Sequence, residues 1–262
     1  MKFAYCLEML YTDLPFTKRI AEAKKDGIDI IEFWDWRDKD IMLLKHELQR
    51  LNMRVSNFSG NRQYGMIDPA EKENFLTEIR ESGTVAKEMG CPNLLLLVQK
   101  LEKDNSGKLP KINLTMKQIE NNIIECGKEA GKIADELNLH IVIEPLNDVL
   151  DHPNYVLTSS LTAVNLVKAI NHPRVKILYD IYHMAMQGED VISSIKDSIL
   201  QIGYFHVADK PGRNEPGTGE VDYPKILSML KKLKYQGIIA FEYLPASGNS
   251  KRSIQMTKKI FN

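Results

Sequence analysis

The chain has 262 residues, which suits one large α/β domain as well as two small ones, and its hydrophobic fraction of 43% is enough for a sizeable core. The 35 Lys and Arg residues balance the 35 Asp and Glu residues, so charge gives no reason to expect nucleic acid or an anionic membrane as a partner. No apolar run approaches the roughly 20 residues of a membrane span.

Short apolar runs alternate with amphipathic stretches along the whole sequence. The runs, which we predict to be strands, occupy residues 3–7, 28–33, 54–58, 94–98, 141–144, 177–180, 203–206 and 238–242. The amphipathic stretches, which we predict to be helices, occupy about residues 15–26, 38–51, 68–90, 115–137, 159–170, 190–200, 223–233 and 249–260. Pro15 near the start of the first stretch and Gly27 just past its end are typical helix boundaries.

Eight strand–helix units favour a closed parallel barrel. Parallel strands buried on both faces appear as nearly continuous apolar runs, as these do. No GxGxxG motif follows the first run, which argues against an open doubly wound sheet. No linker or shift in composition divides the chain. The sequence therefore predicts an α/β protein with a (β/α)8 TIM barrel fold, a single domain over residues 1–262.

The three cysteines, Cys6, Cys91 and Cys126, are widely spaced and form no CxxC motif. We interpret all three as reduced thiols of a cytoplasmic protein, and Cys6 and Cys91 as small core residues. Glu8 and Asp13 interrupt the first apolar stretch, so no secretory signal is predicted.

Four of the runs end on a residue that can bind a metal ion: Glu144, Asp180, His206 and Glu242. A carboxylate or imidazole at the end of a buried strand is costly unless something pairs with it. In a closed barrel these strand ends form the mouth, where active sites lie. Three carboxylates and one imidazole favour Mn²⁺ or Mg²⁺, with Co²⁺ and Zn²⁺ as alternatives. The competing interpretation is four unrelated strand-end residues, each satisfied by its neighbours.

A divalent ion at this position suggests a reaction at a carbonyl group. The ion would act as a Lewis acid on a hydroxy-carbonyl substrate and stabilise an enediolate. Glu144 and Glu242 come from different strands and are placed to flank the substrate. We expect one glutamate to remove a C–H proton and the other to deliver a proton to the neighbouring carbon.

Two further residues are candidates for substrate binding. His183 follows Asp180 by three residues and is placed to donate to a substrate oxygen, although a structural histidine is the alternative. Arg213 lies in the loop after the seventh strand and suits a substrate carboxylate, unless it pairs with Glu215 or Glu220.

Two other segments near the predicted mouth remain open to more than one interpretation. Trp34 and Trp36 either stack on a sugar or pack against a neighbouring loop or subunit. The polar segment 99–114 is either a lid or a plain surface loop.

Four segments of the sequence resemble the xylose isomerase-like barrel superfamily, and within it the hydroxypyruvate isomerase family most closely. They are Ile143–Asn147, Tyr179–Met184, Ala208–Glu220 and Phe241–Tyr243. The resemblance implies a divalent metal at Glu144, Asp180, His206 and Glu242, with Glu144 and Glu242 as the acid–base pair and His183 and Arg213 contacting substrate. It implies interconversion of hydroxypyruvate and tartronate semialdehyde, an intramolecular aldose–ketose type isomerisation in carbohydrate metabolism.

Departures from the pattern of the hydroxypyruvate isomerases keep a second function open within this superfamily, although one segment also departs from the epimerases. Bacterial hydroxypyruvate isomerases often have glutamine where this chain has His206, whereas histidine resembles the ketose 3-epimerases. The segment 147–153 differs from the epimerases, and the segment 57–62 differs from the hydroxypyruvate isomerases. The alternative is therefore a ketose 3-epimerase or another keto-sugar isomerase on the same site.

Two more distant alternatives are a DNA-repair endonuclease on the same barrel and a non-catalytic binding barrel. The endonuclease would need clustered histidines and a basic groove, and the chain has only six histidines and no net charge. We expect a small hydroxy-keto acid or keto-sugar as the substrate, no nucleic acid or membrane partner, and a homodimer or homotetramer.

Overall fold

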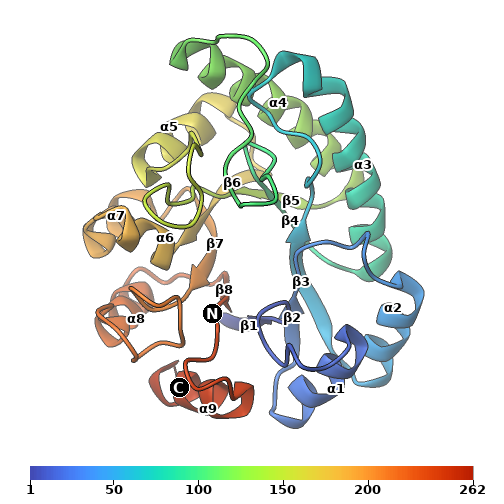
Figure 1. Ribbon diagram of the computed structural model, residues 1–262, viewed down its shortest axis with the longest axis vertical. Coiled ribbons are helices and arrows are strands. Elements are labelled where there is room, and N and C mark those ends of the chain that lie inside the picture. The colour runs from blue at the N-terminus through green and yellow to red at the C-terminus, as the bar shows by residue number, and fades with distance from the viewer. Residues whose placement is uncertain (262) are drawn as a thin grey trace.

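The eight apolar runs form eight parallel strands that close into a barrel in the computed structural model, which describes residues 1–261 (Figure 1). The strands are β1 (Lys2–Cys6), β2 (Ile30–Glu32), β3 (Arg54–Ser59), β4 (Asn93–Leu96), β5 (His140–Ile143), β6 (Val175–Asp180), β7 (Ile202–Val207) and β8 (Ile238–Phe241). Each strand pairs with the next along the chain, and β1 also pairs with β8. The predicted (β/α)8 barrel is confirmed.

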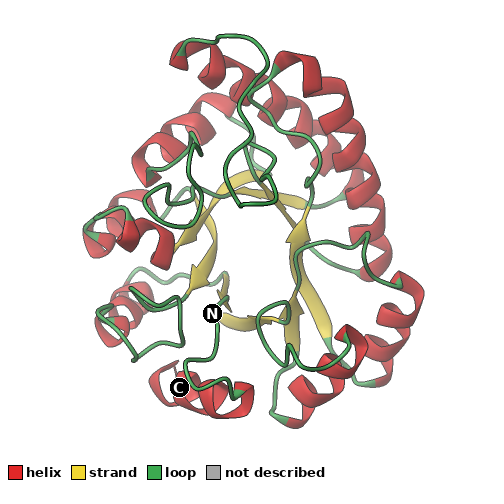
Figure 2. Cartoon of the chain, viewed as in Figure 1, coloured by secondary structure: helices red, strands yellow, loops and turns green. Residues whose placement is uncertain are grey.

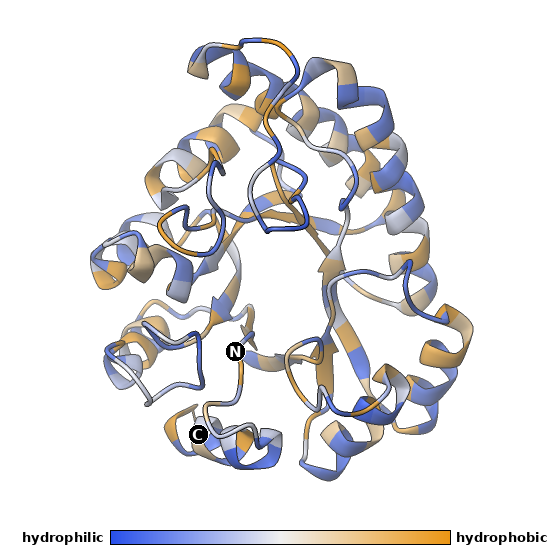
Figure 3. Ribbon diagram, in the orientation of Figure 1, coloured by the Kyte–Doolittle hydropathy of each residue, from blue (hydrophilic) through white to orange (hydrophobic). Residues whose placement is uncertain are grey.

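Helices surround the barrel on its outer side, as Figure 2 shows. They are α1 (Phe16–Lys25), α2 (Ile41–Arg50), α3 (Lys72–Met89), α4 (Met116–Leu137), α5 (Ser160–Ile170), α6 (Ile181–Met186), α7 (Val191–Ser198), α8 (Tyr223–Lys232) and α9 (Ser250–Phe261), with a short 3-10 helix at Pro69–Glu71. The helices in Figure 3 carry both hydrophobic and hydrophilic segments, because each packs one face on the barrel and exposes the other.

Polar caps set the starts of several helices where the sequence predicted them. The Thr115 side chain accepts from the backbone N–H of Gln118, and the Gln118 side chain bonds back to Thr115, which completes a capping box for α4. At the end of α3, Gly90 adopts a left-handed conformation with φ 67°, which glycine adopts without steric cost.

The sequence did not predict helix α6, which follows β6 without a loop. The Asp180 side chain accepts the backbone N–H of His183 at 3.0 Å and so caps this helix. Strand β2 is also shorter than predicted, because it covers only Ile30–Glu32, three residues of the predicted run 28–33. The segment 99–114 contains neither a helix nor a strand, which agrees with the predicted loop.

The core is formed by the inner and outer faces of the strands together with the inner faces of the helices. Cys6 and Cys91 are buried, as predicted, Cys126 is buried as well, and all three are free thiols. Within residues 1–261, no helix is both long and apolar enough to cross a bilayer.

Candidate active site at the carboxyl ends of the strands

The four predicted metal-binding residues lie together at the mouth of the barrel. Asp180 and His206 are paired neighbours on β6 and β7, while Glu144 and Glu242 immediately follow β5 and β8. All four are buried, and one ligand atom from each lies within 4.8 Å of the others. The His206 Nδ1 atom is 3.1 Å from Glu144, 3.5 Å from Glu242 and 3.9 Å from Asp180.

This donor set fits a divalent cation. Three carboxylates at such short separations repel one another in a buried site unless positive charge compensates them. Carboxylate oxygens with one imidazole nitrogen are ligands for hard or borderline ions such as Mn²⁺ and Mg²⁺. Asp180 uses one oxygen to cap α6, which leaves the other facing His206.

The electrostatic environment makes the two glutamates different. Burial raises the pKa of Glu144 to about 7, and the nearby His206 only partly offsets this. Burial alone would also raise the pKa of Glu242, but His206, Arg213 and Trp34 together hold it below its ordinary value. The pKa of Asp180 is raised to about 6, again mainly by burial.

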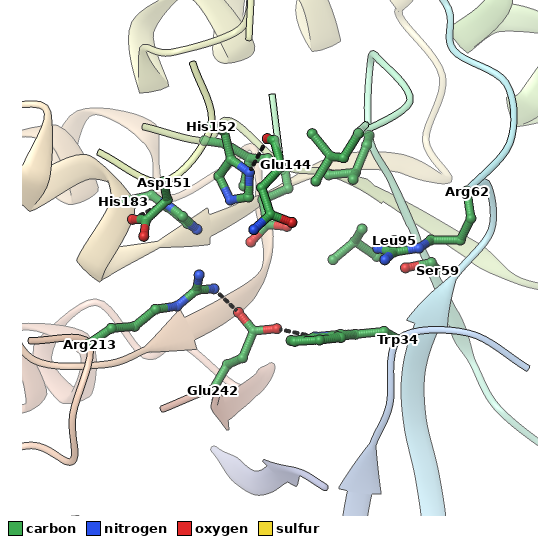
Figure 4. Close-up of a pocket in the computed structure, with 14 residues that line it drawn as sticks. Trp34, Ser59, Arg62, Leu95, Glu144, Asp151, His152, His183, Arg213 and Glu242 are labelled. Carbon is green, nitrogen blue, oxygen red and sulfur yellow. Dashed lines mark hydrogen bonds and ion pairs between the residues drawn. The ribbon is translucent and has the colours of Figure 1, made fainter. Parts of the chain in front are cut away.

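Two donors from distant parts of the chain hold the Glu242 carboxylate. The Arg213 Nη2 atom donates to one oxygen at 2.6 Å, and the Trp34 indole N–H donates to the other at 2.7 Å. Both contacts are drawn in Figure 4. Arg213 thus pairs with Glu242 and not with Glu215 or Glu220, the partners considered from sequence. Trp34 has a polar role that sequence analysis did not anticipate.

Trp36 lies outside this arrangement. Its indole N–H donates to the Ser82 hydroxyl on α3 at 2.9 Å, and the Arg37 guanidinium stacks over its ring. Of the two tryptophans, Trp34 lines the pocket, whereas Trp36 packs against a neighbouring helix.

His183 is fully buried, and its contacts determine which nitrogen carries the proton. Its Nδ1 atom lies 2.7 Å from the side-chain amide nitrogen of Asn147 and 3.3 Å from the Asn147 backbone N–H. Both neighbours are donors, so Nδ1 accepts and the hydrogen is on Nε2. Burial lowers the pKa of His183 well below its ordinary value, and Arg213 adds to this. The neutral ring therefore has an Nε2–H at the pocket wall that makes no hydrogen bond within the described residues 1–261.

Sequence analysis missed Glu32, which lies beneath the four-residue cluster. It is buried at the end of β2, with one oxygen accepting from the Tyr204 hydroxyl at 2.8 Å and the other 3.0 Å from His206 Nε2. Within residues 1–261, neither this second Glu32 oxygen nor His206 Nε2 has a hydrogen-bond partner, so their 3.0 Å approach is an ion-pair contact. A carboxylate on this side of the ring stabilises the tautomer with the hydrogen on Nε2, which frees Nδ1 for the cluster. The sequence did contain a signal for this role, because Glu32 is an acidic residue within an otherwise apolar predicted strand.

These residues surround a cavity of about 150 Å³, enough for several water molecules and hence for a small ligand. Figure 4 shows Glu144 and Glu242 facing the same central space, with Arg213 and Arg62 on opposite sides of it. Apolar side chains from β4 and the following loop form part of the wall.

Comparison with known proteins agrees with this architecture. The model of the xylose isomerase-like TIM barrel family matches residues 20–260. Hydroxypyruvate isomerase from Escherichia coli is 28% identical over 253 residues, covering 94% of this chain and 94% of that protein. The 2-oxo-tetronate isomerase of Pectobacterium atrosepticum is 28% identical over 251 residues, covering 93% of this chain and 92% of that protein.

Among solved structures, the crystal structure of AP endonuclease, family 2, from Brucella melitensis superposes with a TM-score of 0.88. It is 24% identical, and the match covers 98% of each chain, so this likeness concerns the fold alone. The full-length relatives confirm the prediction of an isomerase related to hydroxypyruvate isomerase. With its closed eight-stranded barrel and a family match over residues 20–260, the chain belongs to the xylose isomerase-like TIM barrel family.

Proposed function

We propose that the protein is a divalent-metal-dependent isomerase that interconverts hydroxypyruvate and tartronate semialdehyde through an enediolate form of the substrate. The observation that carries the proposal is the pair Glu144 and Glu242, buried beside Asp180 and His206 within one small cavity. The two relatives described above are named for isomerising small keto acids, which supports the substrate class.

Glu144, Asp180, His206 and Glu242 would hold the ion, with Mn²⁺ or Mg²⁺ preferred and Co²⁺ or Zn²⁺ as alternatives. When bound, a divalent ion supplies Lewis-acid polarisation of the substrate carbonyl.

The two glutamates move the protons. Conversion of hydroxypyruvate to tartronate semialdehyde removes a proton from C3, adds one to C2 and shifts a hydroxyl proton between the two oxygens, so atoms balance. Donation from Trp34 and Arg213 stabilises the ionised form of Glu242, which suits the base that takes the C3 proton. Glu144 then delivers the proton to C2, and the reverse reaction exchanges these roles.

His183 and Arg213 position the substrate. The Nε2–H of His183 is directed to a substrate oxygen, because no acceptor in residues 1–261 lies within hydrogen-bond distance and the Asp180 carboxylate is 3.8 Å away. The Nη2 atom of Arg213 stays hydrogen-bonded to Glu242, and its Nε atom has no hydrogen-bond partner in residues 1–261. Arg213 thus contacts the reacting end of the substrate.

Proton NMR of the protein with hydroxypyruvate in D₂O tests the proposal. We expect tartronate semialdehyde to form with deuterium at C2, activity to be lost with EDTA, and activity to return with Mn²⁺ or Mg²⁺. Turnover that persists in Glu144→Gln or Glu242→Gln proteins would contradict the acid–base roles. Absence of hydroxypyruvate turnover together with C3 epimerisation of a ketose would replace the proposal with the epimerase alternative, which His206 favours.

A further inference from the structure

Arg62 is a cation in the pocket wall that has no anionic partner among the residues that the structure describes. It lies in the loop after β3, lines the cavity and is half-buried. Within residues 1–261 its guanidinium makes no hydrogen bond or ion pair with another side chain, whereas Arg213 is bound to Glu242. Figure 4 shows the two arginines entering the pocket from opposite sides.

The loop that carries Arg62 is held by two buried polar side chains. Asn61 donates to the carbonyl groups of Tyr64 and Leu97 at 2.8 and 2.9 Å and accepts the Leu97 N–H at 3.0 Å. Glu78 on α3 accepts the backbone N–H of Arg62 at 2.8 Å and those of the next two residues. The backbone under Arg62 is therefore fixed, and its side chain starts from a defined point at the cavity edge.

The surroundings of Arg62 favour an anion from outside the protein. The carboxylates of Glu144 and Glu242 belong to the cluster around His206, and Asp151 is hydrogen-bonded to Asn147 at 2.6 Å. The pocket wall near Arg62 includes the apolar side chains of Leu95 and Leu97. Apolar walls strengthen charge–charge attraction, and a guanidinium binds a carboxylate through two parallel hydrogen bonds. A neutral hydroxyl group would leave the positive charge uncompensated.

We propose that Arg62 binds the substrate carboxylate and makes the site selective for small hydroxy-keto acids over neutral sugars. The inference rests on the proposed isomerase function and refines it, since Arg213 was the carboxylate ligand expected from sequence. The substrate then lies across the pocket with its reacting carbons beside Glu144 and Glu242 and its carboxylate on the β3 side. The neutral analogue with the same carbon count is dihydroxyacetone, in which a hydroxymethyl group replaces the carboxylate.

The test compares wild-type protein with Arg62→Gln and Arg62→Lys variants on hydroxypyruvate and on dihydroxyacetone in D₂O. Arg62→Gln should raise KM for hydroxypyruvate about 10- to 100-fold, the range for loss of a charged hydrogen-bonded pair, with little change in kcat. Arg62→Lys keeps the positive charge but loses the two parallel N–H donors of the guanidinium, so it should recover part of the affinity. The KM for proton exchange on dihydroxyacetone should rise much less than the KM for hydroxypyruvate, and an equal rise for both substrates would contradict the carboxylate role. Arg80→Gln, an exposed arginine on α3 paired with Glu136, is the matched control.

Binding of D-glycerate, measured by the rise in Tm it produces, gives a readout that does not depend on turnover. Wild-type protein should be stabilised by glycerate and Arg62→Gln should not. Unchanged KM and unchanged glycerate stabilisation in Arg62→Gln would overturn the role of Arg62 while leaving the isomerase proposal intact. Glycerate binding that depends on Arg62 without turnover of hydroxypyruvate would refute the reaction and retain the carboxylate site. Absence of both turnover and glycerate binding in wild-type protein would refute both.

Discussion

Replacing Glu32 by glutamine should weaken metal binding without unfolding the barrel. In the native protein one Glu32 oxygen lies 3.0 Å from His206 Nε2, and the other accepts from Tyr204. Glutamine has nearly the same shape, but its amide group can place N–H hydrogens opposite His206. That arrangement favours the tautomer with the hydrogen on Nδ1, the atom that faces Glu144, Asp180 and Glu242.

The magnitude follows from the charge that is removed. At an effective dielectric constant of about 20, two unit charges separated by 3.0 Å attract by roughly 5 kcal/mol. An imidazole bound to a divalent ion carries only part of a unit charge, so the loss should be a fraction of this value. Removing the outer partner of a metal-binding histidine costs about 10- to 100-fold in affinity, or roughly 1.4 to 2.8 kcal/mol. We expect a decrease in this range.

Isothermal titration with Mn²⁺ measures the effect, and circular dichroism verifies that each variant is folded. Tyr204→Phe is the matched control, because it removes the hydroxyl that donates to Glu32 but leaves the Glu32 charge beside His206. It should change Mn²⁺ affinity less than Glu32→Gln does. An affinity of Glu32→Gln within twofold of wild type would refute the reasoning about the tautomer. Absence of Mn²⁺ binding by the wild-type protein would refute the metal site itself.

Three further changes test the site and the loop beside it. Glu242→Gln should lower kcat about 10²- to 10⁴-fold, as expected for loss of a general base, and a deuterium-exchange rate equal to wild type would contradict its role. Asn147→Asp replaces the side-chain donor beside His183 Nδ1 with an acceptor, so the imidazole hydrogen should move from Nε2 to Nδ1. ¹⁵N NMR of the imidazole detects this change of tautomer, and an unchanged spectrum would contradict the assignment. Burial raises the pKa of Glu78 above its ordinary value of 4.5, despite three backbone N–H donors and Arg37, so the folded protein holds this proton more tightly than the unfolded chain. The stability that this proton contributes is present below about pH 4.5 and is lost as the pH rises through the raised pKa. Over this pH range the free energy of unfolding, measured by urea denaturation, should therefore fall less for Glu78→Gln than for wild type.

The sequence by itself determined the fold and the four residues of the candidate metal centre. Eight apolar runs of strand length, separated by amphipathic stretches, leave few arrangements other than a closed parallel barrel. In such a barrel the carboxyl ends of all strands meet at one mouth, so residues that end successive strands must come together. Glu144, Asp180, His206 and Glu242 could be placed in this way because their positions depend only on strand order.

Only the tertiary structure decided which groups surround that centre. Trp34 donates to Glu242 across 208 positions of the sequence, and Glu32 on β2 approaches His206 on β7 across the closed barrel. These contacts depend on the tilt and register of the closed sheet and on the rotamers of long side chains, which a linear pattern does not encode. Arg62 is the clearest case, because its segment resembled no expected motif. Its place in the pocket follows from a loop held by Asn61 and Glu78, two buried side chains whose partners become apparent only when the barrel has closed.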